Sequence, residues 1–257
     1  MIVTTAGRTT ADMMIRAKQV ADDLQCRFEK RKEDSIAHIV KKFQDDVLVV
    51  GKNRLELYPE TGEDSFFFHP NSASFRMKRL LRGEHDPFIE VTKLEQGMSM
   101  LDCTLGLASD SIVASYVTGE NGKVTGIEGN KMIAYIVKEG LQQWGSEQKA
   151  MNEAMRRISV VHNEHLTYLK QCEDQSFDVV YLDPMFEQTV AQSDGIQGLK
   201  HFALYEDIDG ETIREALRVA KKRVVLKDHF RSARFETYGF NVQRRKSASF
   251  HFGVLEK

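Results

Sequence analysis

From residue 98 to residue 227, short apolar runs alternate with longer segments whose apolar residues recur at intervals of three and four. The short runs predict β-strands, and the longer segments predict amphipathic helices. Because this alternation is typical of a parallel sheet covered by helices, the sequence predicts an α/β fold. The predicted strands span 98–102, 123–128, 158–162, 177–182 and 223–227, and the predicted helices about 110–117, 131–141, 166–172 and 210–220.

Two further apolar runs, 240–245 and 250–255, follow without a helical segment between them. Neighbouring strands joined by a short connection pair antiparallel, whereas parallel pairs need a long crossover. We therefore expect these runs to form an antiparallel hairpin at the edge of the mostly parallel sheet.

Residues 1–70 predict a small α/β unit of their own, and residues 71–257 the main domain. Asp86-Pro87 is typical of the start of a helix, which we expect to run through Leu94 and close at Gly97. The first residues predict a strand at 2–5, followed by a helix whose apolar face consists of Met13 or Met14, Ala17, Val20, Ala21 and Leu24. A short strand at 27–29 and a helix capped by Asp34 or Ser35 come next. They are followed by a hairpin of 47–50 and 55–58, a strand at 66–68 and a basic helix at about 76–82.

The composition excludes several classes of protein. With 36 basic and 38 acidic residues the formal net charge is -2, so a polyanion would have to meet a local basic patch. Three scattered cysteines argue against a disulfide framework and a structural zinc site. No window approaches the roughly 18 apolar residues of a membrane span, and no targeting segment is evident. We expect an unprocessed cytoplasmic protein with no membrane partner.

A small-residue turn follows the strand at 98–102 and opens the next helix. Asp102 ends the strand, and Gly106 and Ala108 permit close approach of a bound molecule to backbone N–H groups and to the helix N-terminus. Glu128 ends the next strand 22 residues after Gly106, the spacing at which an acid accepts hydrogen bonds from ribose hydroxyls. The sequence therefore predicts an adenosine-type ligand.

Other ligands and a purely local role were considered for this turn. A dinucleotide fingerprint would need glycines where Ala108 and Ser111 stand, so NAD is disfavoured, and a Walker loop is absent. In the alternative interpretation, Asp102 only caps the turn and Gly106 only permits it.

The sequence Tyr181-Leu182-Asp183-Pro184-Met185-Phe186 lies at the end of the strand at 177–182. Asp183 and the carbonyl of Pro184 could accept both N–H groups of an exocyclic amine on a nucleobase. Phe186 could stack on the base. Because Asp-Pro is also common in turns, a structural role is the alternative.

Together these motifs resemble the class I S-adenosylmethionine-dependent methyltransferases, and within them the bacterial small-subunit ribosomal RNA guanine-N2 methyltransferases. The similarity covers residues 66–257. It rests on 66–68 with the basic helix after it, the turn 102–110, Asp183-Pro184-Met185-Phe186, the strand 223–227 and the closing His251-Phe252-Gly253.

The resemblance implies a seven-stranded Rossmann-like fold with S-adenosyl-L-methionine as cofactor. For the catalytic roles, the motif at the end of the strand predicts Asp183, Pro184 and Phe186. The turn itself predicts cofactor contacts at Asp102, Gly106, Ala108 and Ser109. The resemblance implies further contacts at Asp110, Glu128, Gly129, Glu164, His165 and Asp183. The chain departs from the family pattern, which has Gly-Arg at Ala108-Ser109, a Ser pair at Glu164-His165, Pro at Glu187 and Arg-Pro at Asp228-His229.

Several other side chains have competing interpretations. His162 and His165 lack companion ligands at metal-binding spacing, so no metal is expected. Cys103 is better interpreted as a packing residue than as a nucleophile, because no histidine is placed to activate it. Lys227, at the end of a strand on the cofactor side, is more plausibly functional than structural. Phosphate contacts and solvated helix faces explain the remaining basic residues equally well; these are Arg76, Lys78, Arg79, Arg82, Lys221, Lys222, Arg223, Arg231, Arg234, Arg244, Arg245 and Lys246.

The resulting prediction is a transferase that methylates the exocyclic N2 amine of a guanine in small-subunit ribosomal RNA, and thus acts in rRNA methylation and processing. Its expected partner is ribosomal RNA or the small subunit, and the sequence does not indicate an oligomeric state. The alternatives are a methyltransferase for another nucleic acid or a small molecule, and a non-catalytic protein that binds the cofactor or RNA.

Overall fold

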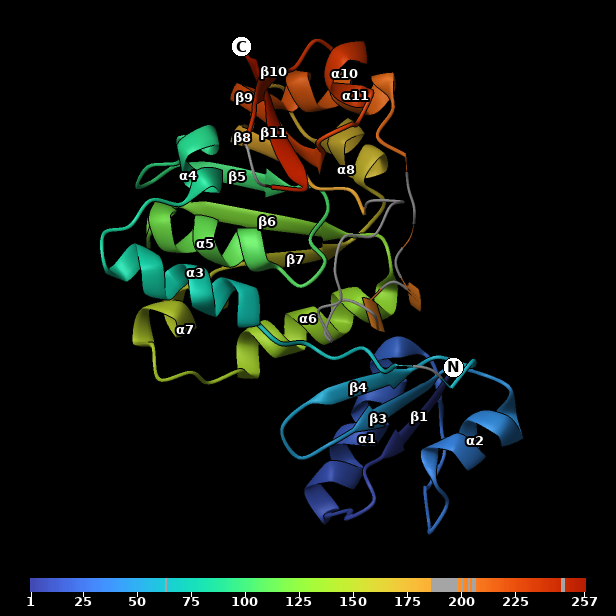
Figure 1. Cartoon of the computed structure of the whole chain (residues 1–257). Helices are drawn as coiled ribbons and strands as arrows, with labels where there is room; N and C mark the ends of the chain where they lie inside the picture. The colour runs from blue at the N-terminus through green and yellow to red at the C-terminus, as the bar shows by residue number, and fades with distance from the viewer. Residues whose placement is uncertain (63, 186–197, 200, 203, 205–206, 246–247) are drawn as a thin grey trace. The chain divides into compact units, whose positions relative to one another are not determined.

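The computed structural model describes residues 1–62, 64–185, 198–199, 201–202, 204, 207–245 and 248–257. The chain divides into two compact units (Figure 1). The first contains Met1–His69, Tyr135–Gln143 and the described residues between 198 and 202, and the second contains the remainder. None of the helices in the described part of the chain is long and apolar enough to cross a membrane.

The first unit is built on a four-stranded sheet of order β2-β1-β3-β4. Strand β1 (Ile2–Thr5) pairs parallel with β2 (Arg27–Phe28) and with β3 (Val47–Val50). Strand β4 (Leu55–Tyr58) pairs antiparallel with β3, which confirms the predicted hairpin. All four side chains of β3 are buried, as expected for a strand covered on both faces.

Helix α1 (Ala11–Leu24) buries the predicted apolar face, and α2 (Ile36–Phe43) begins where the sequence predicts. Ser35 caps α2, because its side chain accepts a hydrogen bond from the backbone N–H of His38. The predicted strand at 66–68 is wrong beyond its first residue, since only Phe66 forms a bridge, with Leu57. Phe68 packs instead against Gly140, where an added Cβ would lie 2.3 Å from the ring.

The second unit contains a seven-stranded sheet of order β10-β11-β9-β8-β5-β6-β7 within the described residues. Strands β5 to β9 are parallel, and β11 pairs antiparallel with both β9 and β10, as the sequence predicts. The strands are β5 (Ser99–Asp102), β6 (Lys123–Glu128), β7 (Ser159–His162), β8 (Phe177–Leu182), β9 (Ala220–His229), β10 (Asn241–Gln243) and β11 (Phe250–Glu256).

The helices after residue 70 largely follow the predicted periodicity. They are α3 (Asn71–Leu81), α4 (Pro87–Thr92), α5 (Ser109–Thr118), α6 (Lys131–Gln143), α7 (Lys149–Arg156), α8 (His165–Gln171), α10 (Gly210–Val219) and α11 (Arg234–Thr237). Most of α6 belongs to the first unit. Helix α4 stops earlier than predicted, because Lys93 adopts a left-handed conformation with φ 48°. Helix α7 was not predicted, since few of its residues are apolar and buried: Met151, Ala154 and Met155.

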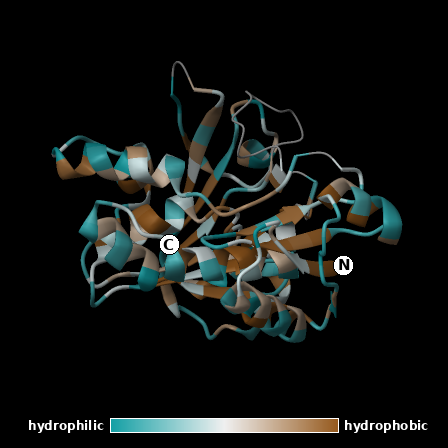
Figure 2. Cartoon of the chain, turned by 90° about the horizontal axis from the view of Figure 1, so that it is seen from below, coloured by the Kyte–Doolittle hydropathy of each residue, from teal (hydrophilic) through white to brown (hydrophobic). Residues whose placement is uncertain are grey.

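Hydrophobic residues gather in the strands, whereas the helices alternate between apolar and polar residues (Figure 2). Leu101, Val180 and Leu226 come from three neighbouring strands and belong to one buried cluster. Leu169 of α8 and Ala216 of α10 complete it. This packing fixes β5, β8 and β9 side by side, and the residues that follow their carboxyl ends are therefore held close together.

Candidate active site

The chain order of the sheet reverses between β5 and β8, because β5 pairs with β6 on one side and with β8 on the other. In open α/β sheets ligands bind at such a switch point, outside the carboxyl ends of the strands. Asp102 lies opposite Tyr181 in the register, so Asp183 lies just beyond it at the same edge. Glu128 ends the neighbouring strand β6.

The turn after β5 has two residues in the left-handed region. Gly106 has φ 48° and Ala108 has φ 60°, and the second of these is the residue that precedes α5. A non-glycine residue in this conformation costs roughly 1–2 kcal/mol, which explains why the family pattern has glycine where this chain has alanine. No side chain caps the N-terminus of α5, so its first N–H groups remain available.

Asp102 holds this turn together from within. Its carboxylate accepts hydrogen bonds from the backbone N–H of Thr104 at 3.1 Å and from the Ser111 hydroxyl at 2.6 Å. Burial raises the pKa of Asp102 to about 7, although the hydrogen bond from Ser111 lowers it. Asp102 is only 2% exposed, so its visible role is to fix the turn. A cofactor contact for Asp102 stays a prediction.

Gly106 and Glu128 are in direct contact, which the sequence did not predict. Glu128 accepts a hydrogen bond from the N–H of Gly106 at 3.2 Å and another from the N–H of Asn130 at 3.0 Å. Gly129 lies between Glu128 and Asn130, and its carbonyl oxygen lies 3.1 Å from the Nε2 atom of His162. A cofactor contact for Gly129 stays a prediction. The contact of Glu128 with ribose hydroxyls, which the spacing of 22 residues predicts, stays a prediction.

Glu164 and His165 follow β7, the next strand along the edge. The Glu164 carboxylate caps α8 by accepting hydrogen bonds from the N–H groups of Leu166 at 3.1 Å and Thr167 at 2.8 Å. These bonds, with that from the Thr167 hydroxyl, outweigh desolvation and lower the pKa of Glu164. His165 is buried. The cofactor contacts predicted for this pair stay predictions.

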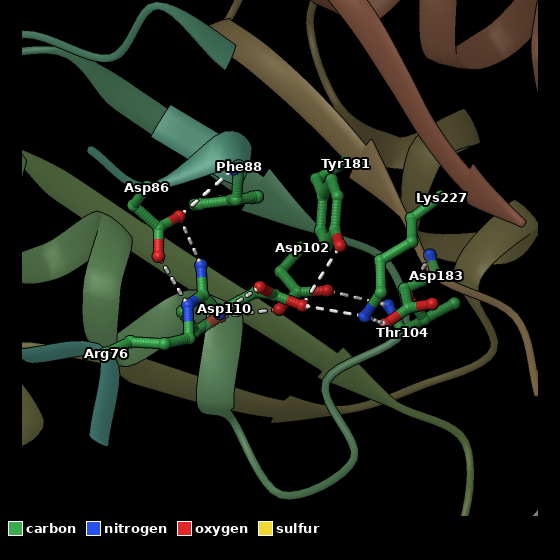
Figure 3. A network of polar contacts seen from close by, with 10 residues as sticks. Arg76, Asp86, Phe88, Asp102, Thr104, Asp110, Tyr181, Asp183 and Lys227 are labelled. Atoms are coloured by element: carbon green, nitrogen blue, oxygen red, sulfur yellow. Dashed lines mark hydrogen bonds and ion pairs between the residues drawn. The ribbon is translucent and has the colours of Figure 1, made fainter. Parts of the chain in front are cut away.

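Asp183 lies at the end of β8 and is fixed from two sides (Figure 3). Its backbone N–H donates to the Thr104 hydroxyl at 2.7 Å, and its carboxylate forms an ion pair with Lys227 of β9. The Asp183 side chain is 24% exposed, so a ligand can still reach it. Pro184 is buried directly after it. Phe186 and Glu187 lie outside the described residues.

Asp110, in the first turn of α5, is the centre of a larger buried network (Figure 3). It accepts a hydrogen bond from the Tyr181 hydroxyl at 3.0 Å and forms ion pairs with Lys227, at 3.4 Å, and with Arg76. Arg76 also makes two bonds to Asp86, each 2.8 Å long. Lys227 therefore bridges the carboxylates of Asp110 and Asp183.

The two carboxylates bonded to Lys227 respond differently to their surroundings. Burial raises the pKa of Asp110, but the positive charges of Lys227 and Arg76 outweigh this effect and lower it to about 2. Burial raises the pKa of Asp183 to about 6 even though Lys227 acts in the opposite direction. Burial also opposes the charge on Lys227, and its two acidic partners nevertheless raise its pKa. Asp110 is thus ionised at neutral pH, whereas Asp183 changes its charge near pH 6.

The structure corrects the sequence interpretation of several basic residues and supports that of Cys103. Arg76 is neither a phosphate contact nor a solvated side chain, because it is paired with Asp86 and Asp110. Arg234 is likewise paired with buried Asp228. Cys103 is buried in the core, and burial raises the pKa of its thiol, as expected for a packing residue.

Comparison with known proteins decides the family. The family model described as "Putative SAM-dependent methyltransferase" matches residues 31–246, which is most of the chain. The chain belongs to this family of SAM-dependent methyltransferases. SAM, S-adenosyl-L-methionine, is therefore the cofactor of this methyltransferase.

Individual relatives of the methyltransferase include proteins named for ribosomal RNA. A Bacillus subtilis (strain 168) protein, "Uncharacterized protein YpiP", is 45% identical over 255 residues, 99% of each chain. The "Ribosomal RNA small subunit methyltransferase J" of Hydrogenovibrio crunogenus is 30% identical over 182 residues, which cover 68% of this chain but only 63% of that protein. The protein of the same name from Buchnera aphidicola subsp. Schizaphis graminum is 27% identical over 188 residues, 70% of this chain and 74% of that protein.

A solved structure confirms the class I methyltransferase fold. The SAM-dependent methyltransferase from Neisseria gonorrhoeae superposes with a TM-score of 0.64 and covers 100% of this chain and 96% of that chain. The two sequences are 15% identical, so the likeness concerns the fold alone.

The residues at the switch point fit the chemistry of SAM. The cofactor carries ribose hydroxyls, an ammonium group and a carboxylate. Glu128 offers a carboxylate that can accept from hydroxyls, and the uncapped N-terminus of α5 offers N–H groups to an anion. Glu128 and the N-terminus of α5 therefore fit the ribose hydroxyls and the carboxylate of the cofactor. The cofactor contact predicted for Asp183 stays a prediction.

Proposed function

We propose that this methyltransferase modifies the exocyclic N2 amine of a guanine in small-subunit ribosomal RNA. The observation that carries the proposal is the accessible Asp183 carboxylate at the end of β8, followed directly by Pro184. An aromatic amine presents two N–H donors, and the Asp183 carboxylate with the Pro184 carbonyl supplies two acceptors. The relatives named as small-subunit ribosomal RNA methyltransferases support the choice of substrate.

The protein side of the reaction consists mainly of positioning. Bound SAM supplies a methyl group on a positively charged sulfur. Because the attacking amine needs no prior deprotonation, the site needs an acceptor that orients the amine rather than a strong base. Asp183 holds the amine through an N–H group, and Lys227 keeps the Asp183 carboxylate ionised and in place. The Asp183 side chain is partly withdrawn from water, and a bound substrate that covers it would withdraw it further.

The role that we propose for Glu128 is to bind the ribose hydroxyls of SAM. Replacing Glu128 by glutamine removes the charge and one acceptor oxygen, and hydrogen bonds to charged groups contribute about 1.5–3 kcal/mol. We expect the Kd for SAM to rise about 10- to 100-fold, with a smaller change in kcat at saturating SAM. Isothermal calorimetry with SAM and with S-adenosylhomocysteine measures the first quantity. Unchanged affinity for both ligands would remove Glu128 from the cofactor site.

The substrate is tested by comparing ribosomal RNA from cells with and without the gene. Mass spectrometry of nucleosides from the small subunit is expected to show loss of one N2-methylguanosine, restored by the wild-type gene and not by an Asp183→Asn variant. A loss in a different RNA, or in no RNA while purified protein still binds SAM, would replace the proposed substrate with another nucleic acid or a small molecule. Absence of transfer to every substrate class would favour a non-catalytic protein.

A further inference from the structure

A group of aromatic and cationic side chains lies where β9 ends and β11 begins, and no role proposed above uses it. Phe250 and His229 are partners in the register of these two antiparallel strands. We name the group the β9–β11 platform; it consists of His229, Phe230, Arg231, Arg245, Phe250 and His251. The platform belongs to the same unit as Asp183 and is continuous with the candidate active site through Lys227.

The first part of the platform is centred on Phe250. The Lys227 ammonium lies 5.1 Å from the centre of the Phe250 ring, and the Arg245 guanidinium lies 4.8 Å from it. Because Lys227 is also bonded to Asp183, only one side chain separates Phe250 from the acid proposed to hold the target amine. Phe250 therefore lies close to the place where the target amine is proposed to bind.

The second part is centred on Phe230, whose side chain is 43% exposed. Its ring lies 4.5 Å from that of His229 and 6.2 Å from that of His251, between centres. The Arg231 guanidinium lies 5.0 Å from the Phe230 ring. A single exposed phenylalanine needs no explanation, but one grouped with two imidazoles and an arginine forms a surface suited to planar, negatively charged ligands.

The backbone that carries Phe230 is held in place by polar contacts. The N–H of Phe230 donates to the carbonyl of Ser249 at 3.2 Å, which joins the end of β9 to the start of β11. Buried Asp228 accepts from the Ser232 hydroxyl at 2.6 Å and from Arg234 at 2.9 Å. A surface fixed in this way loses little conformational entropy when a ligand binds.

We propose that the β9–β11 platform binds unpaired nucleotides that flank the target base, with bases stacked on Phe230 and Phe250 and phosphates near Arg231 and Arg245. This inference rests on the proposed function, because it takes RNA to be the substrate. Aromatic rings interleaved with arginines are typical of sites for single-stranded nucleic acid, and such stacking tolerates any base. Paired bases would not offer free faces to the rings, so the substrate class is single-stranded or looped RNA.

Binding of short RNA to the full-length protein tests the platform. With a fluorescent single strand of about eight nucleotides as the probe, Phe230→Ala is expected to raise the Kd about 5- to 100-fold. Phe230→Trp keeps a planar ring and is expected to stay within about 2-fold of wild type. Phe75→Ala removes the other phenylalanine that is exposed among the described residues, at 65%, and serves as the matched control. Calorimetry with SAM checks that each variant is folded.

The salt dependence of binding gives a second measurement. Arg231→Gln is expected to lower the slope of log K against log salt by about one unit if Arg231 meets a phosphate. The proposal is refuted if Phe230→Ala binds the RNA as tightly as wild type does, or if Phe75→Ala loses as much affinity as Phe230→Ala. It is also refuted if an RNA duplex or a polyglutamate peptide binds the platform more tightly than the single strand does.

Failure of this inference can be told apart from failure of the proposed function. If wild-type protein methylates small-subunit RNA with the same KM as Phe230→Ala, the substrate stands and the platform is wrong. The opposite result is also informative. If the wild-type protein binds RNA but transfers no methyl group to it, and Phe230→Ala weakens the binding, the platform stands and the proposed function is wrong.

Discussion

Asp183→Asn is expected to lower kcat for methyl transfer by about 100- to 1000-fold while the Kd for SAM changes by less than about 3-fold. Asparagine has nearly the shape of aspartate but lacks its charge, so the amine is no longer held by an ionised acceptor. Lys227 loses one of its two acidic partners in the same variant. Single-turnover rates with saturating SAM and small-subunit RNA measure the loss.

The pH profile separates a direct role of Asp183 from a structural one. Burial raises the pKa of Asp183 to about 6, so the acid is ionised above this pH and protonated below it. We expect kcat of the wild type to fall as the pH is lowered through about 6, and the Asp183→Asn variant to lack this dependence. Asp178→Asn is the control, because Asp178 lies on the same strand but bonds to Ser99. An equal loss of activity in both variants would contradict the assignment.

Asp110→Ala is expected to lower the free energy of unfolding by about 3–5 kcal/mol, because it leaves buried positive charges without their shared partner. Arg76 and Lys227 both pair with Asp110, and the Tyr181 hydroxyl donates to it. Urea unfolding followed by circular dichroism measures the difference. The matched control is Asp174→Ala, which breaks an exposed ion pair with Arg218 and is expected to cost less than about 1 kcal/mol.

The pH dependence of stability gives the sign of the Asp110 contribution. Burial opposes ionisation, but Lys227 and Arg76 lower the pKa of Asp110 from 3.8 to about 2. A depressed pKa means that the stabilisation is present above the ordinary value and is lost as the pH falls through about 2. The difference between wild type and Asp110→Ala should therefore persist at pH 5 and shrink below about pH 3. A difference that is constant over this range would show that lost packing, and not charge, causes the effect.

The parts of the site that follow directly on strands could be predicted from the sequence. Glu128 and Asp183 each end or follow an apolar run, and the carboxyl ends of parallel strands meet at one edge of a sheet. Gly106 and Glu128 flank a single crossover and meet in the fold, whereas the ribose contact that their spacing predicts stays a prediction. The sheet was predictable for the same reason, because its strands are buried runs with clear boundaries.

The charge network could not be predicted in this way. Arg76 lies on α3 and reaches Asp110 across 34 residues, and its sequence neighbours Lys78 and Arg79 gave it the appearance of a surface basic residue. Only the packing of α3 against α5 shows that Arg76 points inward. The pairing of Lys227 with Asp183 likewise depends on β8 and β9 being neighbours in the sheet. The residue pattern within each strand does not indicate which strand lies beside it.

Ala108 limits how far the turn before α5 can change in sequence. Its positive φ disfavours β-branched and bulky residues, and its complete burial leaves no room for a longer side chain. Both constraints admit only glycine and alanine, which are one methyl group apart. Ser109, the next residue, is partly exposed and faces neither constraint. Related methyltransferases can therefore differ at the position of Ser109, whereas the position of Ala108 stays confined to glycine and alanine.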